Sequence, residues 1–292
     1  MAETMMIDNE VNVANLEARL SRVRGIAIRT RGHTHGFITR LMSPGDLGEL
    51  VKPFVFLDYF ANEKFEGPGM AVHPHSGIAT HTTLLRGRTT YQDSTGKSGI
   101  LPTHSVEWMQ AGGGVWHGGK PFAGEPIQGY QLWIALPQAL ENAPAESHYI
   151  DPSAIESDER VRVLLGAYGN LRSPIPYHEP LTYLHVRLKD GERWRFTPPQ
   201  DHDVAWTAVH QGKLQVAGVT LDREMAVFEE GAGEIELRAQ GDTELVVGSA
   251  KKHAHPLVCG SYSVHTSAAA LAQGESGIRR IADRSLVSRK ER

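Results

Sequence analysis

Short segments in which polar and apolar residues alternate, separated by glycine and proline, run through most of this chain. The clearest are FVFLDYF at 54–60, HTTLLRGRTTYQD at 81–93 and GYQLWIALP at 129–137. Successive side chains of a β-strand point to opposite faces, so the alternation predicts strands. The 30 glycines among 292 residues suit the tight turns between them. An all-β fold of barrels or sandwiches is therefore expected.

The expected strands form two groups that resemble each other. Residues 83–91, TLLRGRTTY, align with residues 208–216, AVHQGKLQV, when the glycine of one is placed on the glycine of the other. Internal repetition on this scale indicates duplicated domains. We predict a first domain over 20–140, a surface linker over 141–165 and a second domain over 166–285, with short C-terminal helices.

Composition and charge limit the classes of partner. The formal charge of −4 gives no reason to expect nucleic acid or an anionic membrane as a partner. The single cysteine, Cys259, excludes an intrachain disulfide and fits a reducing compartment. The first twenty residues are unlike a secretory signal, and no apolar stretch reaches the length of about 18 residues that a membrane helix needs. We therefore expect a cytoplasmic protein.

Three histidines fall within nine residues of AVHPHSGIATHTT, which begins at Ala71, and no acidic residue lies among them. His73 and His75 are two positions apart, so in a strand they project from one face, about 7 Å apart, and can share a metal ion. A second string, AGGGVWHGG, places His117 after a glycine turn. The sequence therefore predicts a metal site in the first half of the chain.

The two strings read G-x5-H-x-H and G-x-G-x2-H, and in this order they resemble the paired motifs of the cupin superfamily of metal-binding β-barrels. HPHSGIAT, EWMQAGGGVWH and GYQLWIALP further resemble the pirin-family patterns H-P-H-R-G-F-E-T, Q-W-M-T-A-G-x-G-(I/V)-x-H and G-x-Q-L-W-x-x-L-P. The similarity extends from about residue 26 to about residue 272. It implies a bicupin, two β-barrel domains with iron or a similar metal in the first barrel only.

Carried over residue by residue, the resemblance assigns three metal ligands: His73, His75 and His117. The family's fourth ligand, a glutamate, falls on Gly119, and the acid of its first motif falls on Ala79. His81 is the nearest candidate for a fourth ligand, because it has the strand parity of the ligand pair if no bulge intervenes. The alternative is a histidine satisfied by a backbone carbonyl.

The resemblance also implies a metal and a choice of functions. Imidazole ligands suit several divalent transition metals; we expect iron, with nickel, copper, zinc or manganese as alternatives. Several pirin-like proteins degrade flavonols as quercetin 2,3-dioxygenases, whereas others are regulators that act through protein partners. We therefore expect either a dioxygenase that binds a flat, flavonol-like molecule or a non-enzymatic, metal-dependent regulatory or scaffold protein.

The missing glutamate and the second domain give two further expectations. Activity should be weak, because Gly119 cannot accept a substrate proton, and Gly119→Glu should restore it unless the backbone there requires glycine. Glu107 and Glu125 are the nearest acids in the sequence, but neither is assigned as the base.

We expect no metal in the second barrel, which has no H-x-H pair, and we place His202 and His210 in loops.

Overall fold

Two antiparallel sheets form the first domain in the computed structural model, which describes residues 23–290. The larger sheet has seven strands: β2 (His33–His35), β3 (Ile38–Met42), β4 (Phe54–Asn62), β6 (Ile78–Arg86), β9 (Val106–Gln110), β11 (Ile127–Ala135) and β12 (Glu146–Ile150). The smaller sheet has four: β5 (Met70–His75), β7 (Thr89–Asp93), β8 (Ser98–Leu101) and β10 (Val115–Gly119). Their orders are β12-β9-β6-β11-β4-β3-β2 and β5-β10-β7-β8.

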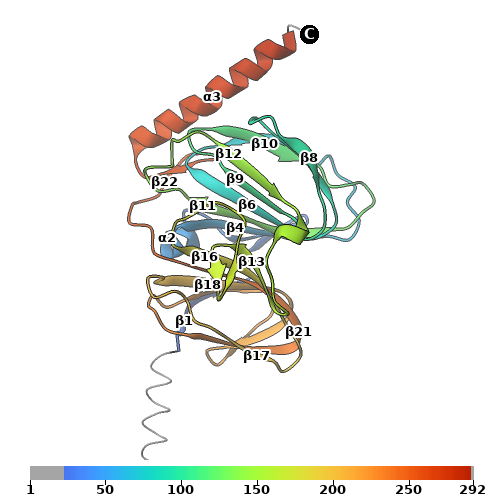
Figure 1. Ribbon diagram of the computed structural model, residues 1–292, viewed down its shortest axis with the longest axis vertical. Helices are drawn as coiled ribbons and strands as arrows, with labels where there is room; N and C mark the ends of the chain where they lie inside the picture. Colours follow the sequence, from blue (N-terminus) through green and yellow to red (C-terminus); the bar gives the residue numbers. More distant parts are fainter. Residues whose placement is uncertain (1–22, 291–292) are drawn as a thin grey trace, which may run out of the picture.

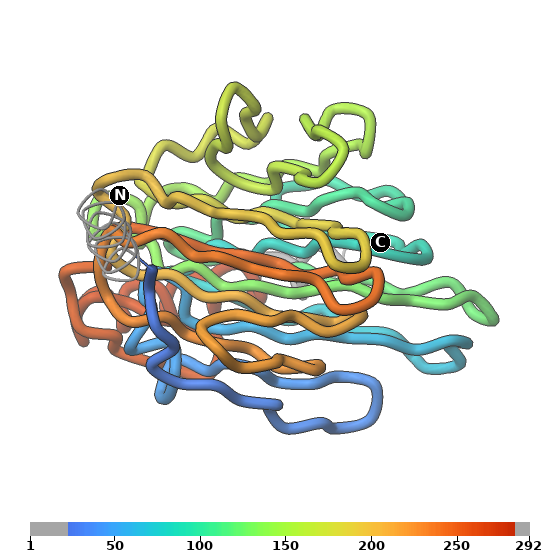
Figure 2. Tube along the Cα trace, turned by 90° about the horizontal axis from the view of Figure 1, so that it is seen from below, coloured from blue at the N-terminus to red at the C-terminus, as the bar shows by residue number. Residues whose placement is uncertain are grey.

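The second domain is built on one eight-stranded sheet (Figures 1 and 2). Its strands are β1 (Ile26–Thr30), β13 (Val161–Leu165), β16 (Leu181–Leu188), β17 (Arg193–Phe196), β18 (Val204–Val216), β19 (Val219–Leu221), β20 (Met225–Phe228) and β21 (Ile235–Ala250). The main path runs β1-β20-β18-β21-β16-β13, while β17 pairs with β21 and β19 with β18. A core of apolar and aromatic side chains, Trp194, Phe196 and Phe228 among them, lies in the interior of this domain.

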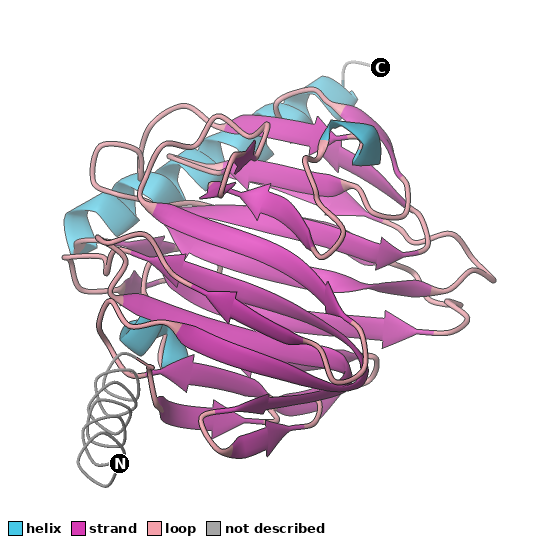
Figure 3. Ribbon diagram, turned by 60° about the horizontal axis from the view of Figure 1, so that its bottom comes forward, coloured by secondary structure: helices cyan, strands magenta, loops and turns pink. Residues whose placement is uncertain are grey.

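The remaining elements are short, apart from one helix. They are the two-stranded ribbons β14 (Ala167–Tyr168) with β15 (Leu171–Arg172) and β22 (Val258–Cys259) with β23 (Val264–His265), the 3₁₀ turn at Pro152–Ala154, and the helices α2 (Leu47–Val51) and α3 (Ala268–Lys290). The helices lie at the periphery of the sheets (Figure 3). No helix in the described part of the chain has the length and apolar character needed to span a membrane.

The large sheets of the two domains pack face to face through a shared apolar core. Tyr130, Leu132 and Trp108 of the first sheet belong to the same buried cluster as Tyr183 and Trp206 of the second. The rings of Phe54 and Trp206 meet edge to face, with their centroids 5.5 Å apart. Since side chains alternate along a strand, the seven-stranded sheet presents one set of residues to this interface and the other set to the interior of its own barrel.

The expectation of an all-β, two-barrel protein is confirmed, but the strand pairing divides the chain differently from the predicted boundaries. β1 lies in the predicted first domain, yet it pairs with β20 of the second. The predicted linker at 141–165 is not a simple connector, because β12 pairs with β9 and β13 pairs with β16. The predicted short C-terminal helices are one helix, α3, which lies on the first domain (Figure 1).

We predict that Trp206→Ala lowers the free energy of unfolding by about 3–5 kcal/mol, because it removes a fully buried indole from the core between the domains. Denaturant unfolding followed by circular dichroism measures this loss. Ile100→Ala is the control, since that side chain is 54% exposed and its removal should change stability by no more than about 0.5 kcal/mol. Equal effects of the two substitutions would contradict a stabilising interdomain core.

Candidate metal centre

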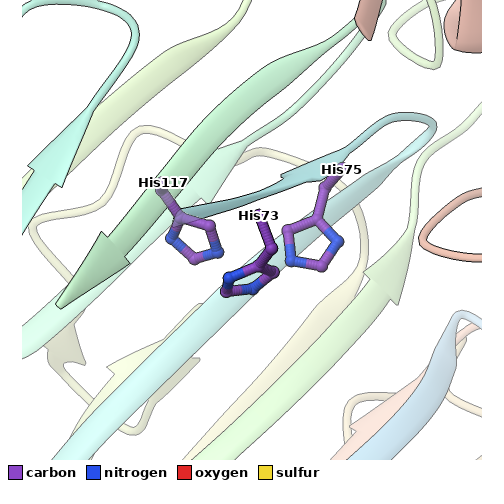
Figure 4. A group of neighbouring side chains, drawn as sticks. All are labelled: His73, His75 and His117. Atoms are coloured by element: carbon purple, nitrogen blue, oxygen red, sulfur yellow. The ribbon is translucent and has the colours of Figure 1, made fainter. Parts of the chain in front are cut away.

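The three predicted histidines come together on the smaller sheet of the first domain (Figure 4). His73 and His75 lie on β5 and His117 lies on β10, directly opposite His73 in the register of the two strands. Pro74 is tolerated between the two histidines because β5 is an edge strand. Each histidine offers a ring nitrogen, and these nitrogens lie within 4.8 Å of one another.

In each imidazole the Nδ1 atom has an acceptor, so the proton is held on Nδ1. His73 donates to the carbonyl of Ala71 at 2.9 Å, and His75 donates to the carbonyl of Tyr262 at 3.0 Å. Nδ1 of His117 lies 3.0 Å from Oε1 of Glu107. The Nε2 atoms of His75 and His117 are buried without a hydrogen-bond partner. Unpaired imidazole nitrogens that face one another fit a metal ion, which needs neutral ligands with free lone pairs.

The protonation states also suit a metal. Burial, followed by the neighbouring His117, lowers the pKa of His73, and the same causes together with His73 lower the pKa of His75 well below its ordinary value. Both imidazoles are therefore neutral at physiological pH. Neutral imidazole is the form that binds transition metals, so neither histidine has to lose a proton when an ion enters the site.

A carboxylate does lie beside the three histidines, and it comes from Glu107 on β9. Its Oε1 accepts from His117, and its Oε2 accepts from the Thr82 hydroxyl at 2.8 Å. Burial acts to raise the pKa of Glu107, but the charge and hydrogen bond of His117 and the hydrogen bond of Thr82 outweigh it, so the pKa is lowered. Glu107 is thus ionised, and it orients His117 from behind as a carboxylate partner to a metal-binding histidine does. The sequence alone did not assign a role to Glu107, because Glu107 and His117 lie on different strands.

The end of the chain also positions the site. After the second domain it returns to the first, where Tyr262 supplies the carbonyl that holds His75. Next to His75, the buried hydroxyl of Ser76 donates to Ser263 at 2.8 Å and lies 3.0 Å from Nε2 of His265. Nδ1 of His265 in turn lies 3.2 Å from Oε2 of Glu141. These bonds fix the loop that follows the second ligand to the C-terminal segment.

A cavity of about 420 Å³ opens between the two sheets of the first domain and reaches His73 and His117. Most of its wall is apolar: Phe37, Phe60, Phe65, Leu84, Leu101 and Ile127. Its polar groups include Thr82, Gln131 and the carboxylates of Asp58 and Glu107. The side chain of Asp58 is held by Arg40 through two contacts, one of them 3.1 Å from Nη2 to Oδ2. A mainly apolar cavity with a few polar groups is typical of a small-molecule site.

His81 does not lie with the other three histidines, so the structure removes it as a candidate fourth ligand. Its Nε2 donates across the domain interface to the carbonyl of Leu164 at 3.3 Å, and its ring packs edge to face on Tyr183. Strand parity does not extend from His75 to His81, because β5 and β6 belong to different sheets and are separated by a turn at Gly77, where φ is +73°. The alternative, an inward histidine satisfied by a backbone carbonyl, is the one observed.

Gly119 occupies a place where a side chain does not fit. A Cβ atom there would lie 2.2 Å from the carbonyl oxygen of Thr90 on β7, and a backbone carbonyl cannot move aside as a flexible side chain can. The expectation that Gly119→Glu restores a ligand is therefore wrong for a steric reason. The left-handed backbone that we considered for this glycine is not the obstacle, because Gly119 is not among the residues with positive φ.

Comparisons with known proteins agree with this architecture. The family model named Pirin matches residues 36–134. A pirin-like protein of Caulobacter vibrioides is 30% identical over 215 residues, which cover 68% of this chain and 74% of that protein. A Pseudomonas aeruginosa protein named "Putative quercetin 2,3-dioxygenase" is 30% identical over 240 residues, which cover 76% of this chain and 84% of that protein.

Solved structures share the fold. A quercetin 2,3-dioxygenase of Acinetobacter baumannii superposes with a TM-score of 0.81 at 23% identity, over 88% of this chain and 97% of that one. The bacterial pirin YhhW of Escherichia coli, solved in complex with nickel(II), superposes with a TM-score of 0.61 at 20% identity, over 79% of this chain and 98% of that one. At these identities the likeness establishes the two-barrel cupin fold.

We predict that Glu107→Gln weakens metal binding by about 10- to 100-fold, because the isosteric amide no longer places a negative charge behind His117. Competition with a chelator of known affinity measures the change. Glu125→Gln is the matched control, since that carboxylate pairs with Arg88 on the exposed surface. Unchanged affinity in Glu107→Gln would show that the carboxylate does not support the site.

Gly119→Glu should lower the free energy of unfolding by about 1–3 kcal/mol or more and should not tighten metal binding, because its Cβ meets the backbone of Thr90. Gly45→Glu adds the same charge in open space, where an added Cβ meets nothing within 4 Å, and serves as the control in thermal unfolding. If Gly119→Glu were as stable as Gly45→Glu and bound metal more tightly, the steric argument would fail.

Proposed function

The chain belongs to the pirin family of the cupin superfamily, and from this premise we propose that it is a metal-dependent dioxygenase of the quercetin 2,3-dioxygenase type. One divalent transition metal, with iron as the first candidate, would be held by His73, His75 and His117. The substrate would be a flat, flavonol-like aromatic molecule in the adjoining cavity. Quercetin dioxygenase-like relatives at 30% identity support this choice of substrate class.

The observation that carries the proposal is the set of buried imidazole nitrogens without partners at the end of an apolar cavity. All three Nδ1 atoms have acceptors, which leaves the Nε2 atoms for an ion. Three protein ligands leave coordination positions open, as a catalytic metal site requires. When bound, the metal would accept a substrate oxygen and mediate electron flow from the substrate to dioxygen.

The chain's own residues orient the substrate and take up its proton. The aromatic and aliphatic walls of the cavity would stack on a planar ring system and exclude water from it. We assign the hydroxyl proton of the substrate to Glu107, because this carboxylate is ionised and lies beside the ligands. Loss of this proton would leave an enolate oxygen on the substrate, facing the histidines. Dioxygen is the oxidant: carbon–carbon bonds in the oxygen-containing ring of the flavonol break, and both atoms of dioxygen enter the cleaved product.

Glu107 would take over part of the role of the glutamate in the family motif, namely to supply a negative charge near the metal. In the pirin pattern that EWMQAGGGVWH resembles, the position of Glu107 is glutamine, and the missing glutamate falls on Gly119. Relative to that pattern, this chain has a carboxylate at position 107 and none at position 119. Placed behind His117, it balances one positive charge of the metal without occupying a coordination position.

We predict oxygen uptake when the protein, loaded with iron(II) or nickel(II), is given quercetin. Glu107→Gln should lower kcat by about 10²- to 10⁴-fold at saturating metal, since it removes the proton acceptor. Asp58→Asn tests the other carboxylate of the cavity wall and should have the smaller effect on kcat. His73→Ala should abolish both metal binding at this site and oxygen uptake.

A metal-loaded protein that consumes no more oxygen with quercetin than the metal-free protein would refute the dioxygenase assignment. That result would favour the alternative for this family member, a metal-dependent regulatory protein that acts through protein partners. Full turnover in Glu107→Gln would instead show that the reaction needs no carboxylate at this position.

A further inference from the structure

A second group of metal-binding side chains lies between the two domains. His185 on β16, His210 on β18 and Glu244 on β21 come from three neighbouring strands of the second sheet. Each lies two positions from a residue of the interdomain core, namely Tyr183, Ala208 and Val246. Strand alternation turns His185 and Glu244 toward the first domain, and His210 contacts Tyr59 and Tyr130 of that domain. All three ligands lie outside the apolar interior of the second barrel.

The distances from Glu244 to the two histidines match those between ligands of one tetrahedral ion, and all three ligand atoms lie within 4.8 Å of one another. Oε2 of Glu244 lies 3.2 Å from Nε2 of His185 and 3.5 Å from Nε2 of His210. Two ligands of a tetrahedral zinc ion with bonds of about 2.0–2.1 Å are separated by about 3.3 Å. An ion could thus be accommodated with little movement of the side chains.

The surroundings favour a bound ion. The side chains of His185 and His210 are each only 1% exposed, whereas that of Glu244 is 29% exposed, so an ion can reach the buried imidazoles from the carboxylate side. Both imidazole Nε2 atoms lie close to the same carboxylate oxygen, Oε2 of Glu244, so the three side chains converge on one point.

The first domain supplies contacts that hold His210 in place. The Tyr130 hydroxyl lies 3.2 Å from Nδ1 of His210, and the Tyr59 ring stacks on the imidazole at a centroid distance of 5.7 Å. Metal-binding histidines usually have a hydrogen-bond partner on the second ring nitrogen, and Tyr130 fills that position here. The cluster thus combines ligands from one domain with supporting side chains from the other.

We propose that His185, His210 and Glu244 bind one divalent cation of the zinc class at the domain interface, with water completing its coordination. Two imidazoles and one carboxylate are the donor set that zinc accepts. The sequence led us to expect no metal in the second domain because we looked for histidines paired as H-x-H. Here the ligands are 25 and 34 residues apart and only the sheet brings them together.

Zinc titration of the purified full chain, after removal of bound metal, tests this site separately from the first one. Wild type should bind one equivalent of zinc more than Glu244→Gln or His185→Ala, measured by equilibrium dialysis and elemental analysis. His202→Ala is the matched control, because this buried histidine of the same domain bonds Ser249 and lies outside the cluster. That variant should bind as much zinc as wild type.

The test does not depend on the proposed function. His73→Ala removes a ligand of the first site and should leave one equivalent of zinc that Glu244→Gln then abolishes. In that background, cobalt(II) should show the intense absorption of a tetrahedral ion, which disappears with Glu244→Gln. Equal zinc binding by wild type and Glu244→Gln, with unchanged thermal unfolding in the absence of metal, would overturn the proposal. The cluster would then be a carboxylate that accepts hydrogen bonds from two imidazoles.

Discussion

The seven-stranded sheet of the first domain has to bury both of its faces, and most features of the molecule depend on that constraint. One face packs on the second domain and the other lines the cavity, so neighbouring residues on one strand have unrelated tasks. On β6, His81 faces Tyr183 across the interface while Thr82 bonds Glu107 in the cavity. On β9, Trp108 belongs to the interdomain core and Glu107 to the metal centre. The second domain therefore supports the site by covering the back of the sheet that builds it.

The position of the carboxylate changes the electrostatics of the centre. With imidazoles as its only protein ligands, a divalent ion would meet no negative charge in its first coordination sphere. Glu107 lies one hydrogen bond away, behind His117, and makes that imidazole more electron-rich. The room that a coordinating glutamate would need is closed by the backbone of β7 at Thr90. In this chain, β7 and β10 pack too closely for a coordinating glutamate at position 119, and Glu107 supplies a carboxylate behind His117 instead.

Local periodicity predicted the all-β class, and short motifs identified three histidines that the structure brings together. The same reasoning was wrong for His81, since strand parity was counted through the turn at Gly77 into a different sheet. It also could not place β1, which pairs with β20 almost 200 positions later, or find the role of Glu107. His210 was expected in a loop but lies on β18, where it meets His185 and Glu244 through strand pairing. Pairing partners far apart in sequence leave no local signal.

The carbonyl of Tyr262 holds His75 from 187 positions away, and this has a consequence for biosynthesis. During translation the first domain emerges with all three histidines long before the segment that orients one of them. The chain must return to the first domain before His75 gains the carbonyl of Tyr262 and Ser76 gains its partners Ser263 and His265. An ion that arrived earlier would meet an incompletely ordered set of ligands. If these histidines bind a metal as proposed, a chain that is still being synthesised and has not reached Tyr262 lacks the contact that orients one of the three ligands.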